Sequence, residues 1–211
     1  MAISFVRYPS WPRQAAALLL ATAALPPLAV AAPLEVTVTD GAGKPLANAV
    51  VYAESPQARA AVKPATGIEI AQQGKQFVPQ VSIVPVGSAV NFPNRDTVRH
   101  HVYSFSPVKP FEIKLYVGTP ASPVVFDKPG IAVLGCNIHD NMVAWVVVVD
   151  TPYYGQTGAD GKLTLPNLPP GSYALHTWHA SLPTGSPPLE QPLTVGATPV
   201  QASVRLAAAR P

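Results

Sequence analysis

Apolar and polar side chains alternate over short stretches of this chain, a pattern typical of strands that bury one face. Residues 34–53 predict two strands that form a first hairpin around a Gly-rich turn at Asp40-Gly41. Residues 54–70 are rich in alanine and proline and predict a surface connection. Beyond Phe77 the expected strands follow one another closely, at about 81–86, 89–92, 100–105, 124–126, 130–134 and 142–149.

Residues 142–149 differ from the other expected strands. They contain the run AWVVVV, which is apolar at successive positions and rich in β-branched side chains. Such a run predicts a central strand that is buried on both faces. In the strand that begins at His100, alternation instead places Val102 on the same face as His100 and Tyr103 on the other.

The C-terminal part repeats the strand signals. Asp160-Gly161 is typical of a hairpin turn, a strand is expected over 173–178, and Leu193 with residues 200–206 would close a second sheet. No helical period of useful length follows the first thirty residues, and the 26 prolines and 14 glycines fit short strands joined by turns. We therefore expect an all-β protein with one large domain or two small ones.

The N-terminus has the features of an export signal. Two arginines precede a largely apolar run over 15–30, and the sequence AVA at 29–31 has the small-x-small pattern that signal peptidases accept. The run contains two prolines and is shorter than the roughly 20 residues that a spanning helix needs. We expect residues 1–31 to be a cleaved signal peptide, with cleavage after Ala31 or Ala32, and the mature protein to be periplasmic without a membrane span.

The charge balance and the cysteine count exclude some classes of function and site. Two of the 14 basic residues lie in the expected signal, which leaves 12 basic residues against 11 acidic ones. This near balance is unlike the basic surface of a nucleic-acid-binding protein. The chain has one cysteine, so it cannot form an internal disulfide. In an oxidising compartment, a lone thiol has to be buried, paired between chains or bound to a metal.

The cysteine belongs to the sequence CNIHDNM, which spaces Cys136, His139 and Met142 three residues apart on one loop. A thiolate, an imidazole and a thioether together suit copper that changes between its two oxidation states. Zinc is the alternative metal for cysteine and histidine, but the thioether does not suit it. Taken alone, the cysteine would be a small buried hydrophobe; with its neighbours, the loop predicts a copper site.

Two resemblances cover nearly all of the chain after the expected signal. From about residue 77 to 150 it resembles a cupredoxin, the plastocyanin–azurin β-sandwich, in the stretches FVP, VGSAVNF, NRDTVRHHV and CNIHDNM. The C-x-x-H-x-x-M spacing is similar to the short ligand loop of amicyanin. The flanking stretches VTDGAGKPLANAVVYA and TGADGKLTLPNLPPGSYAL resemble a carboxypeptidase-regulatory, transthyretin-like sandwich.

These resemblances imply a discontinuous domain arrangement. A cupredoxin Greek-key β-sandwich over residues 63–151 would be inserted between the two halves, 33–62 and 152–208, of a smaller transthyretin-like β-sandwich. Proteins of this build resemble those loosely labelled methylamine utilisation proteins.

The cupredoxin resemblance also implies one type 1 copper ion with four ligands. Cys136, His139 and Met142 come from the loop, and a further histidine follows an Asn-containing turn on a neighbouring strand. The family pattern makes this ligand His100, with His101 as the open alternative because it falls where relatives usually carry asparagine. The side chains expected around the ligands are Asn94, His101 and Asn137.

The predicted function is that of an exported blue-copper protein that carries single electrons between periplasmic redox proteins, as a monomer. A copper chaperone or storage module with the same ligands is one alternative, and a non-metal cell-envelope binding module is the other. No set of catalytic residues is apparent in the sequence, so an enzyme is not expected. The other two histidines, His176 and His179, would lie on opposite faces of a strand and are not expected to share a metal.

Overall fold

The computed structural model describes residues 1–2 and 31–207. The predicted signal peptide falls almost wholly outside this part of the chain. Within the described residues, no helix has both the length and the apolar character that crossing a membrane requires.

Nearly all of the regular secondary structure in the described chain is strand, which confirms the predicted all-β class. The one short helix, α1 (Pro56–Ala61), lies in the stretch expected to be a plain connection; Ser55 caps it by accepting the Ala58 N–H. The strands are β1 (Ala32–Asp40), β2 (Val50–Glu54), β3 (Ile68–Glu69), β4 (Ala71–Gln72), β5 (Phe77–Val78), β6 (Val81–Pro85), β7 (Ser88–Asn91), β8 (His100–Ser104), β9 (Phe111–Tyr116), β10 (Val124–Phe126), β11 (Gly130–Gly135), β12 (Val143–Val149), β13 (Tyr154–Gln156), β14 (Lys162–Leu168), β15 (Gly171–Trp178), β16 (Leu189–Val195) and β17 (Val200–Leu206).

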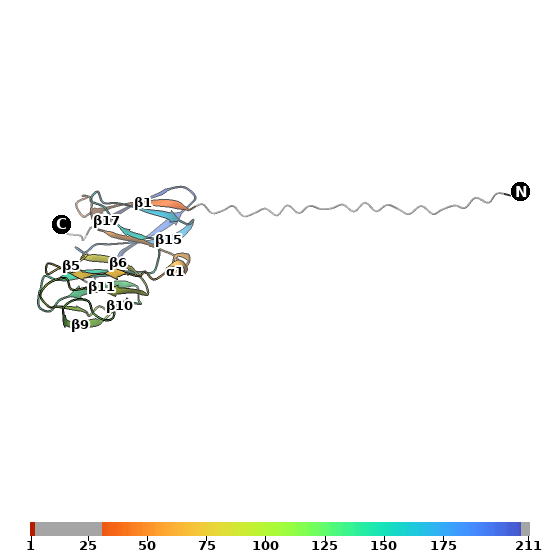
Figure 1. The fold of residues 1–211 in the computed structure, drawn as a ribbon. Coiled ribbons are helices and arrows are strands. Elements are labelled where there is room, and N and C mark those ends of the chain that lie inside the picture. The colour runs from red at the N-terminus through yellow and green to blue at the C-terminus, as the bar shows by residue number, and fades with distance from the viewer. Residues whose placement is uncertain (3–30, 208–211) are drawn as a thin grey trace.

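Apart from the two-stranded sheet β4-β5, the strands form two sandwiches. The flanking sandwich pairs the sheet β14-β1-β17 with the sheet β13-β2-β15-β16, and so combines strands from both ends of the described chain. The central sandwich pairs the sheet β10-β7-β3 with the sheet β6-β12-β11-β8-β9. Figure 1 shows the sheets stacked in layers, with β1 and β17 toward one end of the molecule and β9 and β10 toward the other.

A hydrophobic core fills each sandwich, and another core joins them. The flanking core includes Leu34 and Leu175, and the central core includes Phe92 and Leu134. The core between the two sandwiches brings together side chains of β2 and β15 on one side and of β6, β11 and β12 on the other. The two sandwiches therefore pack face to face through an apolar layer.

Strand β12 is the central buried strand that the run AWVVVV predicted. It lies between β6 and β11. Val146 and Val148 face the central core, whereas Val147 and Val149 face the core between the sandwiches. The absence of polar positions in this run is therefore explained by burial on both faces.

Both hairpin predictions at the glycine turns are wrong. β1 and β2 lie in different sheets, because Val36 and Val51 bury their side chains in the flanking core from opposite sides. Asp160-Gly161 does form a turn, but the Gly161 carbonyl accepts the Val38 N–H at 2.8 Å, and β14 then pairs with β1. The turn at Asp40-Gly41 folds only residues 45–46 back against the end of β1, where Thr39 pairs with Pro45, and the chain then crosses to the other sheet before β2 begins. The turn at Asp160-Gly161 likewise connects the two sheets.

Candidate metal centre

The topology of the central sandwich brings the expected ligands together. His100 is the first residue of β8, and Cys136 directly follows the last residue of β11. These strands are neighbours, with Tyr103 opposite Gly135. The loop from Cys136 then leads into β12, so a histidine and a cysteine that are far apart in the sequence meet at one end of one sheet.

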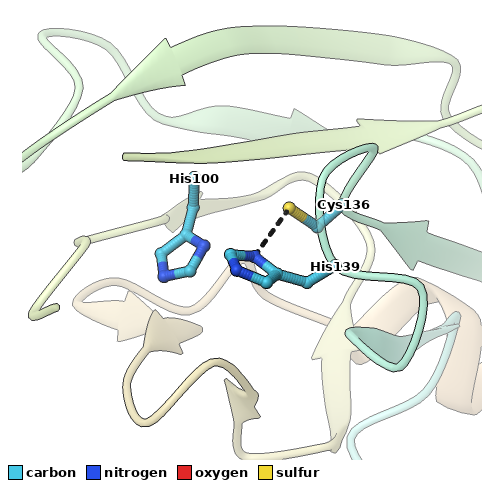
Figure 2. Close-up of side chains that lie close together, drawn as sticks. All are labelled: His100, Cys136 and His139. Atoms are coloured by element: carbon cyan, nitrogen blue, oxygen red, sulfur yellow. Dashed lines mark hydrogen bonds between the residues drawn. The ribbon is translucent and has the colours of Figure 1, made fainter. Parts of the chain in front are cut away.

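Three of the four expected ligands converge on a common space. One potential ligand atom each from His100, Cys136 and His139 lies within 4.8 Å of the other two. The Cys136 Sγ is 3.9 Å from the His139 Nδ1, and the two imidazole rings are 5.0 Å apart between centroids. Figure 2 shows the three side chains, called here the His-Cys-His cluster, turned toward one another from the strand and the loop.

The two nitrogens of His100 have different surroundings. Its Nε2 lies 2.7 Å from the Asp96 carboxylate, whereas its Nδ1 is buried and has no hydrogen-bond partner. A buried imidazole nitrogen without a partner is costly, by about 1–3 kcal/mol, unless something binds it. The Nδ1 is therefore free to act as a ligand, on a ring that Asp96 holds from the far side.

Asp96 is itself held in place. Its carboxylate accepts the backbone N–H groups of Gly74 and Lys75, at 2.7 and 2.9 Å. The Lys75 N–H is the main cause that lowers the pKa of Asp96 below its ordinary value, and the His100 ring adds to it against the effect of burial. The carboxylate is therefore kept ionised beside the ring.

Asn94 shapes the loop that carries Asp96. Its side-chain amide donates to the carbonyls of Val98 and Tyr116, both at 2.8 Å, and its Oδ1 accepts the Asp96 N–H at 3.0 Å. These bonds tie the loop to the end of β9. Asn94 thus supports the position of His100 through Asp96, without touching the cluster itself.

Met142 is the last residue of the loop, and its side chain is buried. Its backbone N–H donates to the His139 carbonyl at 3.0 Å, which closes a turn, and its side chain is 1% exposed. It belongs to the same buried cluster of side chains as Cys136. The thioether is therefore inside the central core, beside the strand end from which the thiol projects.

The alternative ligand His101 lies on the opposite face of β8. Its ring packs edge-on against Tyr103, and its Nε2 is 3.1 Å from Glu112, with an angle too poor for a hydrogen bond. Asn137, expected near the ligands, is exposed on the loop. The structure thus brings His100 to the cluster and directs His101 away from it.

The two C-terminal histidines also lie apart from the cluster. His176 stacks on Tyr52 at 4.7 Å, with one ring nitrogen toward Glu54 and the other toward Glu190. His179 follows β15 and bonds to Ser181. The carboxylates beside His176 lie on opposite sides of its ring, so this group does not converge on a single ion.

Sequence reasoning missed Tyr116 and the strand that carries it. Tyr116 lies opposite His100 in β9, donates to the Phe92 carbonyl at 2.6 Å and accepts from Gln72. Burial raises the pKa of Tyr116, and the nearby Cys136 adds to the increase. The alternation of apolar and charged residues in FEIKLY was the available signal for β9.

The cluster fits a trigonal metal site. Ligand atoms bound at about 2.0–2.3 Å around one ion would be roughly 3.6 Å apart. The separations of up to 4.8 Å are slightly larger, so a small inward movement of the half-buried His139 ring would close the site. Two imidazoles and a thiol, with a buried thioether beside them, form a donor set suited to copper.

Comparison with known proteins gives a limited likeness. No protein-family model matches the chain, and no curated protein matches it. Among solved structures, the chain is similar to a copper-containing nitrite reductase from Thermus scotoductus, with 24% identity and a TM-score of 0.37 over 53% of this chain and 28% of that one.

Other solved structures of smaller proteins also match. A purple cupredoxin from Nitrosopumilus maritimus is 21% identical, with a TM-score of 0.35 over 39% of this chain and 99% of that one. A reduced amicyanin variant is 25% identical, with a TM-score of 0.37 over 48% of this chain and 99% of that one. These TM-scores are low, so the case for a metal centre rests on the side chains of the His-Cys-His cluster.

Proposed function

We propose that this chain is an exported type 1 copper protein that carries single electrons between periplasmic redox proteins. The observation that carries the proposal is the buried, unpartnered Nδ1 of His100 beside the only thiol of the chain and a second imidazole. The same atoms would be poorly placed in a purely structural core, because an unpaired ring nitrogen there only costs stability.

Each ligand would have a separate role. His100, Cys136 and His139 would hold the ion, and the Met142 thioether would be its fourth, weaker ligand. Copper bound there would supply a one-electron couple. The chain's own contribution is rigidity, since His100 is held by β8 and Asp96, and the loop is anchored at β11 and β12. Fixed ligands keep the rearrangement between oxidation states small.

The surface around His139 suits brief contacts with other proteins. His139 is half-buried, whereas the neighbouring Ile138 is 46% exposed and Val98, two residues before His100, is 42% exposed. Small apolar surfaces of this kind favour weak, transient docking over stable association. We propose that electrons enter and leave at the His139 edge, with the protein acting as a carrier and not as an enzyme.

The absorption spectrum of the copper-loaded protein tests the proposal. Cupric ion bound by a thiolate should give an intense visible charge-transfer band, and ascorbate should bleach it with one electron per copper. Cys136→Ser should stay colourless. His100→Gln should lose the band, and His101→Gln should keep it. A wild-type protein that stays pale after incubation with cupric salt would contradict the proposal.

Two further measurements separate the carrier from a copper chaperone with the same ligands. Met142→Leu should still bind copper but with a higher reduction potential, because a thioether ligand tunes the couple. A carrier should also retain its copper against a chelator during many redox cycles. Rapid loss of copper to the chelator would favour a chaperone or storage module.

A further inference from the structure

A cavity of about 390 Å³ lies where the two sandwiches meet. Ile131 and Trp145 of the central sandwich form one wall, Tyr52 and Trp178 of the flanking sandwich form another, and the loop 182–188 borders it. The side chains of Ile131 and Trp145 are on the face of their sheet that packs against the flanking sandwich, away from the core that holds Cys136. The cavity is therefore distinct from the candidate metal centre.

The cavity exists only because the sandwiches are docked. Trp145 comes from β12 and Trp178 from β15, and their rings are 6.2 Å apart at an angle of 54°. Trp178 is 3% exposed and Trp145 is partly exposed, so one ring lies deep and the other closer to solvent. Two tilted indoles and a tyrosine give the cavity flat apolar surfaces on more than one side.

The lining contains no charged side chain. Its polar side chains, apart from the Tyr52 phenol and the indoles, are the hydroxyl groups of Ser106, Thr184 and Ser186. Ser106 accepts the Val133 N–H at 2.9 Å, so its own hydroxyl proton remains free to donate. A charged ligand would lose its hydration here without a compensating partner, which is strongly unfavourable. An uncharged ligand with one or two polar atoms fits this lining.

We propose that the cavity binds a small, uncharged aromatic molecule. Its volume is near the lower end of the roughly 300–1,000 Å³ of small-molecule sites, which suits a ligand of one or two fused rings. A shallow groove continues from the cavity through Ser106, Val133 and Thr184 to the exposed ring of Phe105. Substituents of the ligand can extend along this groove, while its ring system lies in the cavity against the indoles.

A pair of related dyes tests the site in the full chain, with or without copper. N-phenyl-1-naphthylamine is uncharged, and 8-anilino-1-naphthalenesulfonate has the same rings with a sulfonate group. The uncharged dye should quench the emission of Trp145 and Trp178 and take up their excitation energy, and the sulfonate should bind at least roughly tenfold more weakly. Equal binding of the two dyes, or no energy transfer from tryptophan, would overturn the proposal.

Two matched variants locate the binding. Thr184→Arg places a cation in the exposed wall of the cavity and should weaken binding of the uncharged dye by roughly tenfold or more. Thr198→Arg makes the same change on an exposed bend outside the cavity and should leave the affinity unchanged. Thermal melts of both variants check that the fold is kept. Equal affinities for Thr184→Arg and the wild type would place the dye elsewhere and refute the cavity.

Discussion

The two sandwiches are constructed alike, but two of their buried polar side chains, Thr157 in one and His100 in the other, differ in how their atoms are paired. In the flanking sandwich, the Thr157 hydroxyl donates to the Leu46 carbonyl at 2.6 Å and accepts the Ala49 N–H at 2.9 Å. Its oxygen and its proton both have a partner. In the central sandwich, His100 keeps a ring nitrogen unpaired beside the Cys136 thiol. The Thr157 hydroxyl is thus fully hydrogen-bonded, whereas the Nδ1 of His100, at the end of the central sandwich, has no hydrogen-bond partner.

This difference implies separate tasks for the two halves. The flanking sandwich contributes β2 and β15 to the core between the sandwiches, where they cover the outer face of β12. The opposite face of β12 packs in the core that holds the thiol and the thioether. The flanking sandwich therefore supports the sheet at the end of which the candidate metal centre is built.

The largest effect is expected from separating the sandwiches. Val147 and Val148 are neighbours on β12, both buried, but they face the core between the sandwiches and the central core, respectively. Val147→Asp should bury an unpaired charge between the sandwiches, at a cost of several kcal/mol, and split thermal unfolding into two transitions. Val148→Asp should instead remove the transition of the central sandwich. Scanning calorimetry distinguishes the two results.

A single transition at a lower temperature in Val147→Asp would contradict this view. It would mean that the two sandwiches cannot fold independently and that the core between them is part of one cooperative unit.

The next largest effect is expected from copper itself. An ion that binds only the folded state stabilises it by about 4 kcal/mol at a thousandfold excess over its dissociation constant. In the divided Val147→Asp variant, copper should raise the melting temperature of the central sandwich alone. His100→Gln introduced into that variant should abolish the increase. A shift of both transitions would indicate copper binding outside the His-Cys-His cluster.

Much of this arrangement follows from the sequence, for identifiable reasons. The run AWVVVV predicts a strand buried on both faces, because no polar position interrupts it. The alternation after His100 predicts that His100 and His101 point apart, and the structure places them on opposite faces of β8. Local spacing is sufficient for these predictions, because each concerns residues within one strand.

The remaining features depend on contacts between distant segments. Asp40-Gly41 and Asp160-Gly161 have the sequences of hairpin turns, yet each connects two sheets because β1 pairs with β14 and β17. Asp96 looks like a turn residue in the sequence. Its role beside His100 depends on the N–H groups of Gly74 and Lys75, more than twenty residues away. Such partners cannot be read from spacing along the chain.

Asp96 is the source of a third, intermediate effect. Asp96→Asn removes the carboxylate that holds His100 from behind and should weaken copper binding by about 10–100-fold, as is typical for partners of metal-bound histidines. Glu112→Gln is the matched control, because Glu112 is 3.1 Å from His101 on the other face of β8. Competition with a chelator of known copper affinity measures both. A larger loss in Glu112→Gln would favour His101 as the ligand.

The smallest effect is expected at His179, in the flanking sandwich. Burial lowers the pKa of His179 below its ordinary value of 6.5, against a smaller opposing effect of a hydrogen bond with the Ala47 backbone. Its Nδ1 accepts the Ser181 N–H, which requires an unprotonated nitrogen.

The sign of the resulting pH dependence follows from these pKa values. Between about pH 6.5 and the lowered pKa of the folded state, His179 binds a proton in the unfolded chain but not in the folded one. The stability of the folded state is therefore full above about pH 6.5 and decreases as the pH falls from there through the lowered pKa. His179→Gln removes this loss without adding a charge. The melting temperature of the variant relative to the wild type should therefore rise on going from pH 8 to pH 5, most clearly in the flanking-sandwich transition of the Val147→Asp background. A difference that stays constant with pH would show that His179 protonates equally well in the folded and unfolded chain, and that the flanking sandwich carries no acid-sensitive group at this position.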